Sequence, residues 1–152
     1  MNILLIEDDE IKAENILNFL NKEQKNQSKL FWKKSWQGGL IEILDNNIYD
    51  IILLDMSMPR YDSEICDSNE EFETFAGREL MKEMKRKKIF TPVCVVTAFD
   101  IFGKDEYKLN AEELNVELTN EFKNFYLGMI SFSTSLVNWK DELLQVIERV
   151  KQ

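Results

Sequence analysis

Short, uninterrupted apolar runs that end in acidic residues constrain the fold of this chain more than any other feature. Residues 3–6 lead into Glu7 and Asp8, and residues 51–54 lead into Asp55. Four consecutive apolar residues without polar alternation are typical of a strand that is buried on both faces. These runs favour a parallel sheet covered by helices on both sides. Each carboxylate then stands where a strand leaves the core.

Strand and helix patterns alternate along the whole chain. The predicted strands cover residues 2–7, 30–36, 50–55, 93–96 and 126–133. Apolar residues at helical spacing mark the helices between and after them: Ala13, Ile16, Leu17 and Leu20; Leu40, Ile41, Ile43 and Leu44; Leu80, Met81 and Met84; Leu114, Leu118, Phe122 and Phe125; Trp139, Leu143, Ile147 and Val150. We expect Gly38 and Gly39 to break the chain and Asn138 to cap the last helix.

Two connections are long for a compact domain. Residues 60–76 are acidic and polar, and we expect an insertion or lid there, with some helix around residues 70–75. The second long connection covers residues 100–110.

Charge and cysteine content narrow the class of protein. The net charge of −9 argues against nucleic acid as a direct partner, because phosphate binding needs a basic surface. The basic residues Lys82, Lys85, Arg86, Lys87 and Lys88 fall where a helix should end, which suits the helix dipole. Cys66 and Cys94 form no disulfide framework, and Cys94 is expected in the core, so a reducing cytoplasm fits best.

Some classes of site and location are disfavoured by what the sequence lacks. No apolar stretch approaches the roughly 20 residues of a membrane span, and no signal peptide is visible. The chain contains no histidine, which excludes Ser-His and Cys-His catalysis and histidine zinc sites within it.

The acidic residues predict a metal site if the first and third strands are neighbours. Glu7, Asp8 and Asp55 would then meet at one edge of the sheet, with Thr97 at the end of the next strand. Three close carboxylates repel one another and raise each other's pKa unless a cation joins them. This arrangement suggests a divalent cation, with one carboxylate left to react.

Three segments of the chain resemble the receiver domain of two-component response regulators. They are residues 4–10, residues 49–59 and residues 91–98, which follow one another in the family's order. The resemblance is strong in the first, third and fourth strands and weak in the second strand and after Ala98. It implies a flavodoxin-like (βα)5 fold, a doubly wound parallel sheet of strand order 2-1-3-4-5 in three α/β/α layers. It also implies a single receiver domain over residues 1–152, without an output domain.

The resemblance assigns roles to the acidic residues. Asp55 matches the phosphoacceptor aspartate. Asp8 would bind Mg²⁺ directly, and Glu7 mainly through a coordinated water. Ser57 matches the residue whose backbone carbonyl completes the metal site, and Thr97 matches the hydroxyl residue that bonds the phosphoryl group. A set of carboxylates, one carbonyl and waters suits the octahedral oxygen coordination of Mg²⁺.

Each of these residues also has an ordinary structural interpretation. Glu7 and Asp8 could cap the first helix, and Asp9, one position later, is the better candidate for that cap. Asp55 alone would be a common turn residue, and threonine at a strand end, as at Thr97, is unspecific. The combination of Asp55 with the acidic pair favours the receiver interpretation.

The sequence departs from the receiver pattern at the fifth strand. The family carries a lysine there, followed by proline, and the lysine bonds the phosphoryl group. Residues 125–133 contain neither, so Met129 or Ser131 takes the place of the lysine, depending on register. Lys104 or Lys108 in the preceding loop are alternative sources of the charge.

The loop after Asp55 departs from the pattern as well. Pro59 matches the loop proline, but Gly77 stands 18 residues beyond it, whereas the family reaches its glycine within a few residues. The acidic residues 62–73 lie in this extra segment and could shield the site, gate a kinase or bind a partner.

Three functions remain open at this point. The first is a stand-alone receiver that takes a phosphoryl group from a sensor histidine kinase or phosphotransfer protein and signals through a separate effector, with a homodimer possible and no direct nucleic-acid or membrane partner. The second is a pseudo-receiver that binds a partner without phosphorylation. The third is a Mg²⁺-dependent phosphohydrolase with Asp55 as nucleophile, disfavoured because Ser57 stands where many such enzymes have a general acid.

Overall fold

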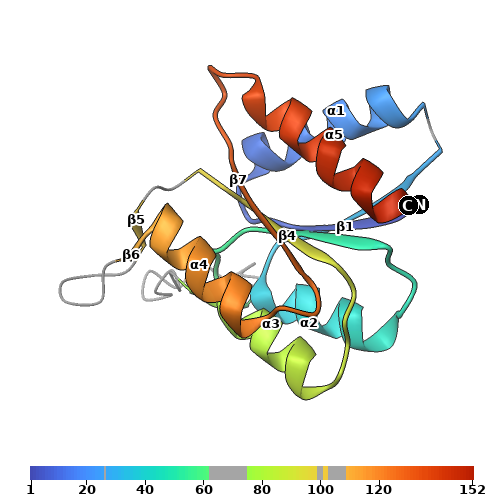
Figure 1. The fold of residues 1–152 in the computed structure, drawn as a ribbon. Helices are drawn as coiled ribbons and strands as arrows, with labels where there is room; N and C mark the ends of the chain where they lie inside the picture. Colours follow the sequence, from blue (N-terminus) through green and yellow to red (C-terminus); the bar gives the residue numbers. More distant parts are fainter. Residues whose placement is uncertain (26, 62–74, 99–100, 103–108) are drawn as a thin grey trace.

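A five-stranded parallel sheet forms the middle layer of the computed structural model, which describes residues 1–25, 27–61, 75–98, 101–102 and 109–152 (Figure 1). The strands of this sheet are β1 (Asn2–Ile6), β2 (Lys29–Lys33), β3 (Ile51–Leu54), β4 (Val93–Thr97) and β7 (Tyr126–Ser131). Their order is β2-β1-β3-β4-β7, and every neighbouring pair is parallel. This order confirms the predicted 2-1-3-4-5 arrangement.

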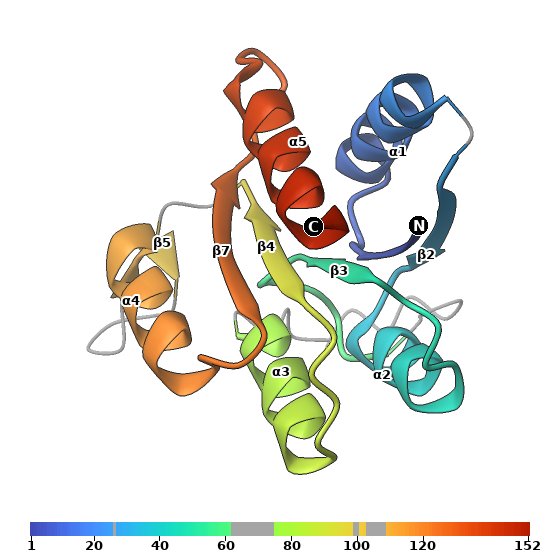
Figure 2. The ribbon, with the colours of Figure 1, turned by 45° about the vertical axis from the view of Figure 1, so that its right-hand side comes forward.

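Helices cover both faces of the sheet. They are α1 (Glu10–Gln24), α2 (Trp36–Asp45), α3 (Ala76–Arg86), α4 (Ala111–Glu121) and α5 (Asn138–Lys151). The α1 and α5 helices lie on one face, and α2, α3 and α4 lie on the other (Figure 2). Among the described residues, no helix is long and apolar enough to cross a membrane.

Burial on both faces explains the unalternated apolar runs. Leu4 and Ile6 of β1 belong to the core under α2, α3 and α4, whereas Ile3 and Leu5 belong to the core under α1 and α5. Successive side chains of a strand point to opposite faces, so both must be apolar when both faces are covered. Each such side chain contributes about 1.5–3 kcal/mol by leaving water.

The second strand and second helix differ from the prediction. The strand was expected to reach Trp36, with Gly38 and Gly39 breaking the chain, but Trp36 begins α2 and both glycines lie inside that helix. Ser35 is the N-cap, and its hydroxyl accepts a hydrogen bond from the Gly38 N–H at 3.0 Å. A Cβ at position 39 would lie 2.6 Å from Ile6 Cδ1, so glycine there lets α2 pack closely on the sheet.

Smaller differences concern the second half of the chain. The fifth strand of the sheet ends at Ser131 instead of residue 133. Asn138 is the first residue of α5 and not its cap, because Val137 occupies the N-cap position without a side-chain hydrogen bond.

The connection before α4 contains two short strands, β5 (Ile101–Phe102) and β6 (Leu109–Asn110), which pair antiparallel and were not predicted. The expected insertion falls mostly on residues 62–74, which lie outside the described residues, as does most of the helix expected around residues 70–75.

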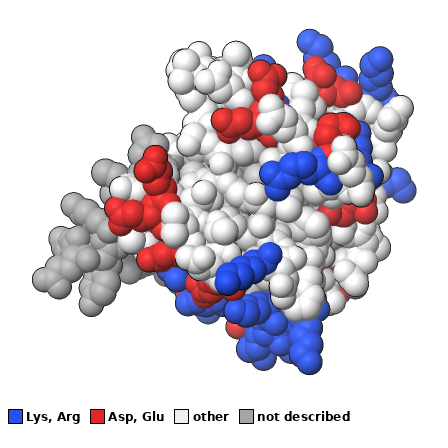
Figure 3. Space-filling model, viewed as in Figure 1, with Lys and Arg blue, Asp and Glu red and all other residues white. Residues whose placement is uncertain are grey.

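The basic cluster lies at the end of α3, as predicted. Lys and Arg side chains gather at the bottom of the molecule in the view of Figure 3, where Figure 1 places the C-terminal end of that helix. The N-terminal end of α3 is next to β3, since the Gly77 N–H donates to the Met56 carbonyl at 3.0 Å. The basic end of the helix therefore points away from the acidic strand ends.

Candidate functional site

Three carboxylates converge at the carboxyl edge of the sheet. The β1 and β3 strands are neighbours, with Ile6 opposite Leu54. The residues that follow these strands, Glu7, Asp8 and Asp55, each offer a carboxylate oxygen within 4.8 Å of the others. A pocket of about 110 Å³ opens here, lined by Glu7, Asp8, Asp9, Lys12, Asp55, Ser57 and Ala98. The predicted convergence of the acidic residues is therefore present in the fold.

The backbone of the two buried acids is fixed by hydrogen bonds between neighbouring strand ends. The Asp55 N–H donates to the Ile6 carbonyl at 3.0 Å, and the Glu7 N–H donates to the Lys33 carbonyl at 3.0 Å. The indole Nε1 of Trp32 donates to the Glu7 carbonyl at 2.8 Å. Glu7 is 1% exposed and Asp55 is 4% exposed, so their carboxylates are held in place and largely removed from water.

Asp9 belongs to the helix and not to the carboxylate cluster. Its side chain accepts a hydrogen bond from the Lys12 N–H at 3.1 Å and so caps α1. Its own N–H donates to Glu7 Oε1 at 3.1 Å. This cap confirms the role predicted for Asp9, and it orients the turn that carries Asp8.

A buried lysine occupies the middle of the site. The Lys12 side chain enters from α1, and its Nζ lies 2.5 Å from Glu7 Oε2 and 3.2 Å from Asp55 Oδ1. Lys12 Nζ also donates to the Val96 carbonyl at 2.7 Å. Apart from this ion pair, Glu7 Oε2 has no hydrogen-bond partner among the residues described.

Lys12 was not among the residues predicted for the site, although the sequence carries a signal for it. Residues 12, 16 and 20 are spaced by four, and Lys12 stands in line with Ile16 and Leu20 on the buried stripe of α1. A lysine in such a stripe, one turn after an acidic cluster, must find anionic or carbonyl partners. The alternative sources of charge, Lys104 and Lys108, lie outside the described residues.

Burial governs the electrostatics of the three acids. It raises the pKa of Asp55 to about 7; the Lys12 ammonium opposes this shift and the Glu7 carboxylate adds to it. Burial also raises the pKa of Glu7, again against the effect of Lys12. For Asp8, burial and the negative charge of Asp55 both raise the pKa. Burial thus outweighs the effect of the Lys12 ammonium, which brings one positive charge to three carboxylates.

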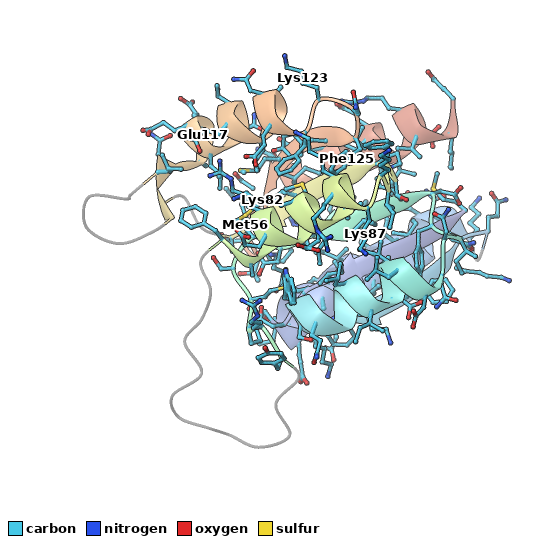
Figure 4. All side chains as sticks on the ribbon, turned by 90° about the horizontal axis from the view of Figure 1, so that it is seen from below. Met56, Lys82, Lys87, Glu117, Lys123 and Phe125 are labelled. Carbon is cyan, nitrogen blue, oxygen red and sulfur yellow. The ribbon has the colours of Figure 1, made fainter. Side chains whose placement is uncertain are left out.

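The loop after Asp55 is held by a hydrogen bond to the Asp55 side chain and by close packing against the start of α3. The Met56 N–H donates to Asp55 Oδ1 at 2.9 Å, and Met56 lies near the N-terminal end of α3 (Figure 4). A Cβ at Gly77 would lie 2.6 Å from the Asp55 carbonyl oxygen, so only glycine permits this approach. The glycine thus packs under Asp55 although it stands far from Pro59 in the sequence. Ser57 is buried beside the pocket.

Thr97 ends β4 beside the site, and its register partner on β7 is Ser131. Thr97 is buried, and its carbonyl accepts a hydrogen bond from the Phe132 N–H at 2.8 Å. Met129 pairs with Val95, two residues before the strand end. Of the two residues expected to take the place of the family lysine, Ser131 is the one opposite Thr97.

Sequence comparison decides the family. No protein-family model matches the chain. It is 30% identical over 145 residues to the Detocs response regulatory protein DtcB of Enterobacter cloacae (strain JD6301), a match that covers 95% of this chain and 97% of that protein. The chain belongs to the response regulator receiver family. The family resemblance identified in the sequence is thereby confirmed.

Solved receiver structures share the fold of this receiver. The receiver domain of the Francisella response regulator 1452 superposes with a TM-score of 0.63 at 22% identity, covering 99% of this chain and 96% of that one. The Thermotoga maritima response regulator TrrA, solved in complex with Mg²⁺ and BeF, gives a TM-score of 0.60 at 19% identity, covering 98% and 97%. These superpositions show that the chain has the flavodoxin-like architecture of solved receiver domains.

Proposed function

We propose that this receiver accepts a phosphoryl group on Asp55 with the help of Mg²⁺, and that it passes the signal to a separate effector protein. The convergence of Glu7, Asp8 and Asp55 around one small pocket is the observation that carries this proposal. The proposed donor is a sensor histidine kinase or a phosphotransfer protein. The proposed domain organisation is a single receiver over residues 1–152.

The donor atoms of the pocket fit a magnesium ion. Carboxylates of Asp8 and Asp55, the backbone carbonyl of Ser57 and waters would hold it, with Glu7 acting through one of those waters. Burial raises the pKa of all three acids, and the Lys12 ammonium brings one positive charge to three carboxylates, which supports binding of a further cation. A bound Mg²⁺ would offset the charge of the attacking carboxylate and of the phosphoryl oxygens.

The chemistry assigned to the protein is a phosphoryl transfer. A carboxylate oxygen of Asp55 attacks the phosphorus of the donor and forms an O–P bond, while the P–N bond to the donor imidazole breaks. The electron pair of that bond leaves with the imidazole nitrogen, which then takes a proton from water. The Thr97 hydroxyl, at the end of the adjacent strand, would donate a hydrogen bond to one phosphoryl oxygen. Its position as the last residue of β4 supports this role.

The test is phosphorylation with a small acyl-phosphate donor and Mg²⁺, followed by intact-mass measurement. We expect one phosphoryl adduct on the wild type and none on Asp55→Asn, because the amide cannot form the aspartyl phosphate. Asp45→Asn is the matched control, since Asp45 is exposed at the end of α2 and should leave the adduct unchanged. A wild type without an adduct from the small donor and from a cognate kinase would refute the proposal.

A phosphorylation-independent pseudo-receiver is the second candidate function. The observation that favours it is the Lys12 ammonium, which pairs with Glu7 and Asp55 and so gives the site an internal positive charge. This candidate predicts that a partner binds the wild type and Asp55→Asn with equal affinity. A gain in affinity upon phosphorylation would exclude it.

A further inference from the structure

Lys12 is a buried cation whose three partners come from three different strand ends. Glu7 follows β1, Asp55 follows β3, and the Val96 carbonyl belongs to β4. The residue is only 4% exposed, and the centroid of the Phe132 ring lies 6.0 Å from Nζ on the side of β7. All strands of the sheet except the edge strand β2 thus place a group near this ammonium.

Lys12 lies on the buried apolar stripe of α1, where an ammonium group without partners would cost free energy. The neighbouring positions of the same stripe, Ile16 and Leu20, are fully buried apolar residues. Burying an ammonium group costs free energy that is recovered only through well-placed partners. At Lys12 these partners include the carboxylate of the proposed phosphoacceptor, so the charge is held at the atoms that would react.

Phosphorylation would place the phosphoryl oxygens next to this ammonium. Lys12 Nζ is 3.2 Å from Asp55 Oδ1, and its bond to the Val96 carbonyl anchors it beside the residue that precedes Thr97. The new group carries more negative charge than the carboxylate it modifies, and a charged hydrogen bond to it is among the strong ones. The described part of β7 offers no competing cation, because residues 126–131 contain no lysine or arginine.

We propose that Lys12 of α1 is the cation that contacts the phosphoryl group in this receiver, in place of a lysine on the last strand. This inference rests on the proposed function of Asp55. The ammonium would exchange its contact with Glu7 for a phosphoryl oxygen and so release the Glu7 carboxylate toward the metal. Helix α1, which carries Lys12, would then sense the phosphorylation state directly.

The experiment measures binding of fluoroberyllate, a phosphoryl mimic, in the presence of Mg²⁺. The wild type, Lys12→Met and the control Lys22→Met are titrated, with tryptophan fluorescence as the readout, since Trp32 donates to the Glu7 carbonyl. Lys22 lies exposed on the same helix. We expect Lys12→Met to weaken fluoroberyllate binding by about tenfold or more. Lys22→Met should bind like the wild type.

Titration with Mg²⁺ alone distinguishes the loss of the contact between Lys12 and the phosphoryl mimic from general damage to the site. Lys12→Met should bind Mg²⁺ as tightly as the wild type or more tightly, because removal of the ammonium leaves the acids without a competing cation. Equal fluoroberyllate affinity of Lys12→Met and wild type would overturn the inference and leave the proposed function standing. A parallel loss of Mg²⁺ and fluoroberyllate binding would also overturn it. A wild type that binds neither would refute the proposed function itself.

A measurement on the wild type covers the case in which Lys12→Met does not fold. The side-chain ¹⁵Nζ resonance of Lys12, a buried and hydrogen-bonded ammonium, should shift when fluoroberyllate is added to the Mg²⁺-bound protein. Lysine resonances of exposed residues such as Lys22 serve as the reference. An unchanged Lys12 resonance at saturating fluoroberyllate would overturn the proposal.

Discussion

Asp55 illustrates how a single residue acquires its properties from its surroundings. In the sequence it is an aspartate after an apolar run, a common turn residue. In the fold its carboxylate is buried, accepts a hydrogen bond from the Met56 N–H and contacts the Lys12 ammonium. The loss of water around the carboxylate raises the pKa to about 7, which the sequence alone does not reveal.

This raised pKa predicts how the stability of the metal-free protein depends on pH. The native state keeps a proton on Asp55 up to about pH 7, whereas the unfolded chain releases it near pH 4. The contribution of this group to stability is therefore complete below about pH 4 and is lost as the pH rises to about 7. Asn resembles the protonated acid, so Asp55→Asn should not show this loss.

Urea unfolding in the presence of a chelator, at a series of pH values, measures the effect. The stability gain of Asp55→Asn over the wild type should grow from about pH 4 to about pH 7 and exceed about 1 kcal/mol at pH 8. Glu7, Asp8 and Lys12 face the same group and remain in both proteins. A gain that does not change with pH, or that also appears in Asp45→Asn, would contradict the prediction.

At the scale of single elements, local sequence patterns predicted a strand or helix correctly where the packing of the fold favours the same structure. The β1, β3 and β4 strands follow from apolar runs because both of their faces are covered. The start of α2 was missed because Gly38 and Gly39 have low helix propensity. Two contacts outweigh that propensity: the Ser35 cap and the close approach of Gly39 to Ile6.

The end of β7 provides a prediction about an element. Ser131 is exposed at the end of β7, opposite Thr97, the last residue of β4. In a Lys12→Met background, Ser131→Lys should recover at least part of the fluoroberyllate affinity, because it returns a cation to the site. The fluoroberyllate titration in the presence of Mg²⁺ measures this affinity.

Ser131→Gln in the same background is the matched control, since it adds length and hydrogen-bonding capacity without charge. It should stay at the affinity of Lys12→Met. If Ser131→Lys gives no recovery beyond Ser131→Gln, then a cation at the end of β7 does not reach the fluoroberyllate.

At the scale of the whole molecule, topology explains most of what the sequence predicted about the site. Neighbouring parallel strands bring Glu7, Asp8 and Asp55 to one edge, and this follows from strand order alone. The Lys12 contacts were not predictable in the same way, because Nζ bonds a carbonyl 84 residues later in the chain. Such a contact depends on how α1 lies on the sheet. The β5–β6 pair was missed because its strands are only two residues long.

The balance of charge across the molecule leads to a last prediction. The chain carries a net charge of −9, and its acidic site favours an added cation. Mg²⁺ that binds only the native state should raise the midpoint of thermal unfolding by mass action, and the rise should grow with Mg²⁺ concentration. Asp8→Asn removes a proposed metal ligand and should show a much smaller rise.

Screening of the net charge also stabilises an acidic protein, so sodium chloride at matched ionic strength is the necessary control. We expect the wild type to gain more from Mg²⁺ than from sodium chloride, and Asp8→Asn to gain about equally from both. Lys12→Met should gain more from Mg²⁺ than the wild type, because the ion no longer competes with an internal ammonium. Equal gains from both salts in the wild type would mean that the carboxylate cluster does not bind Mg²⁺.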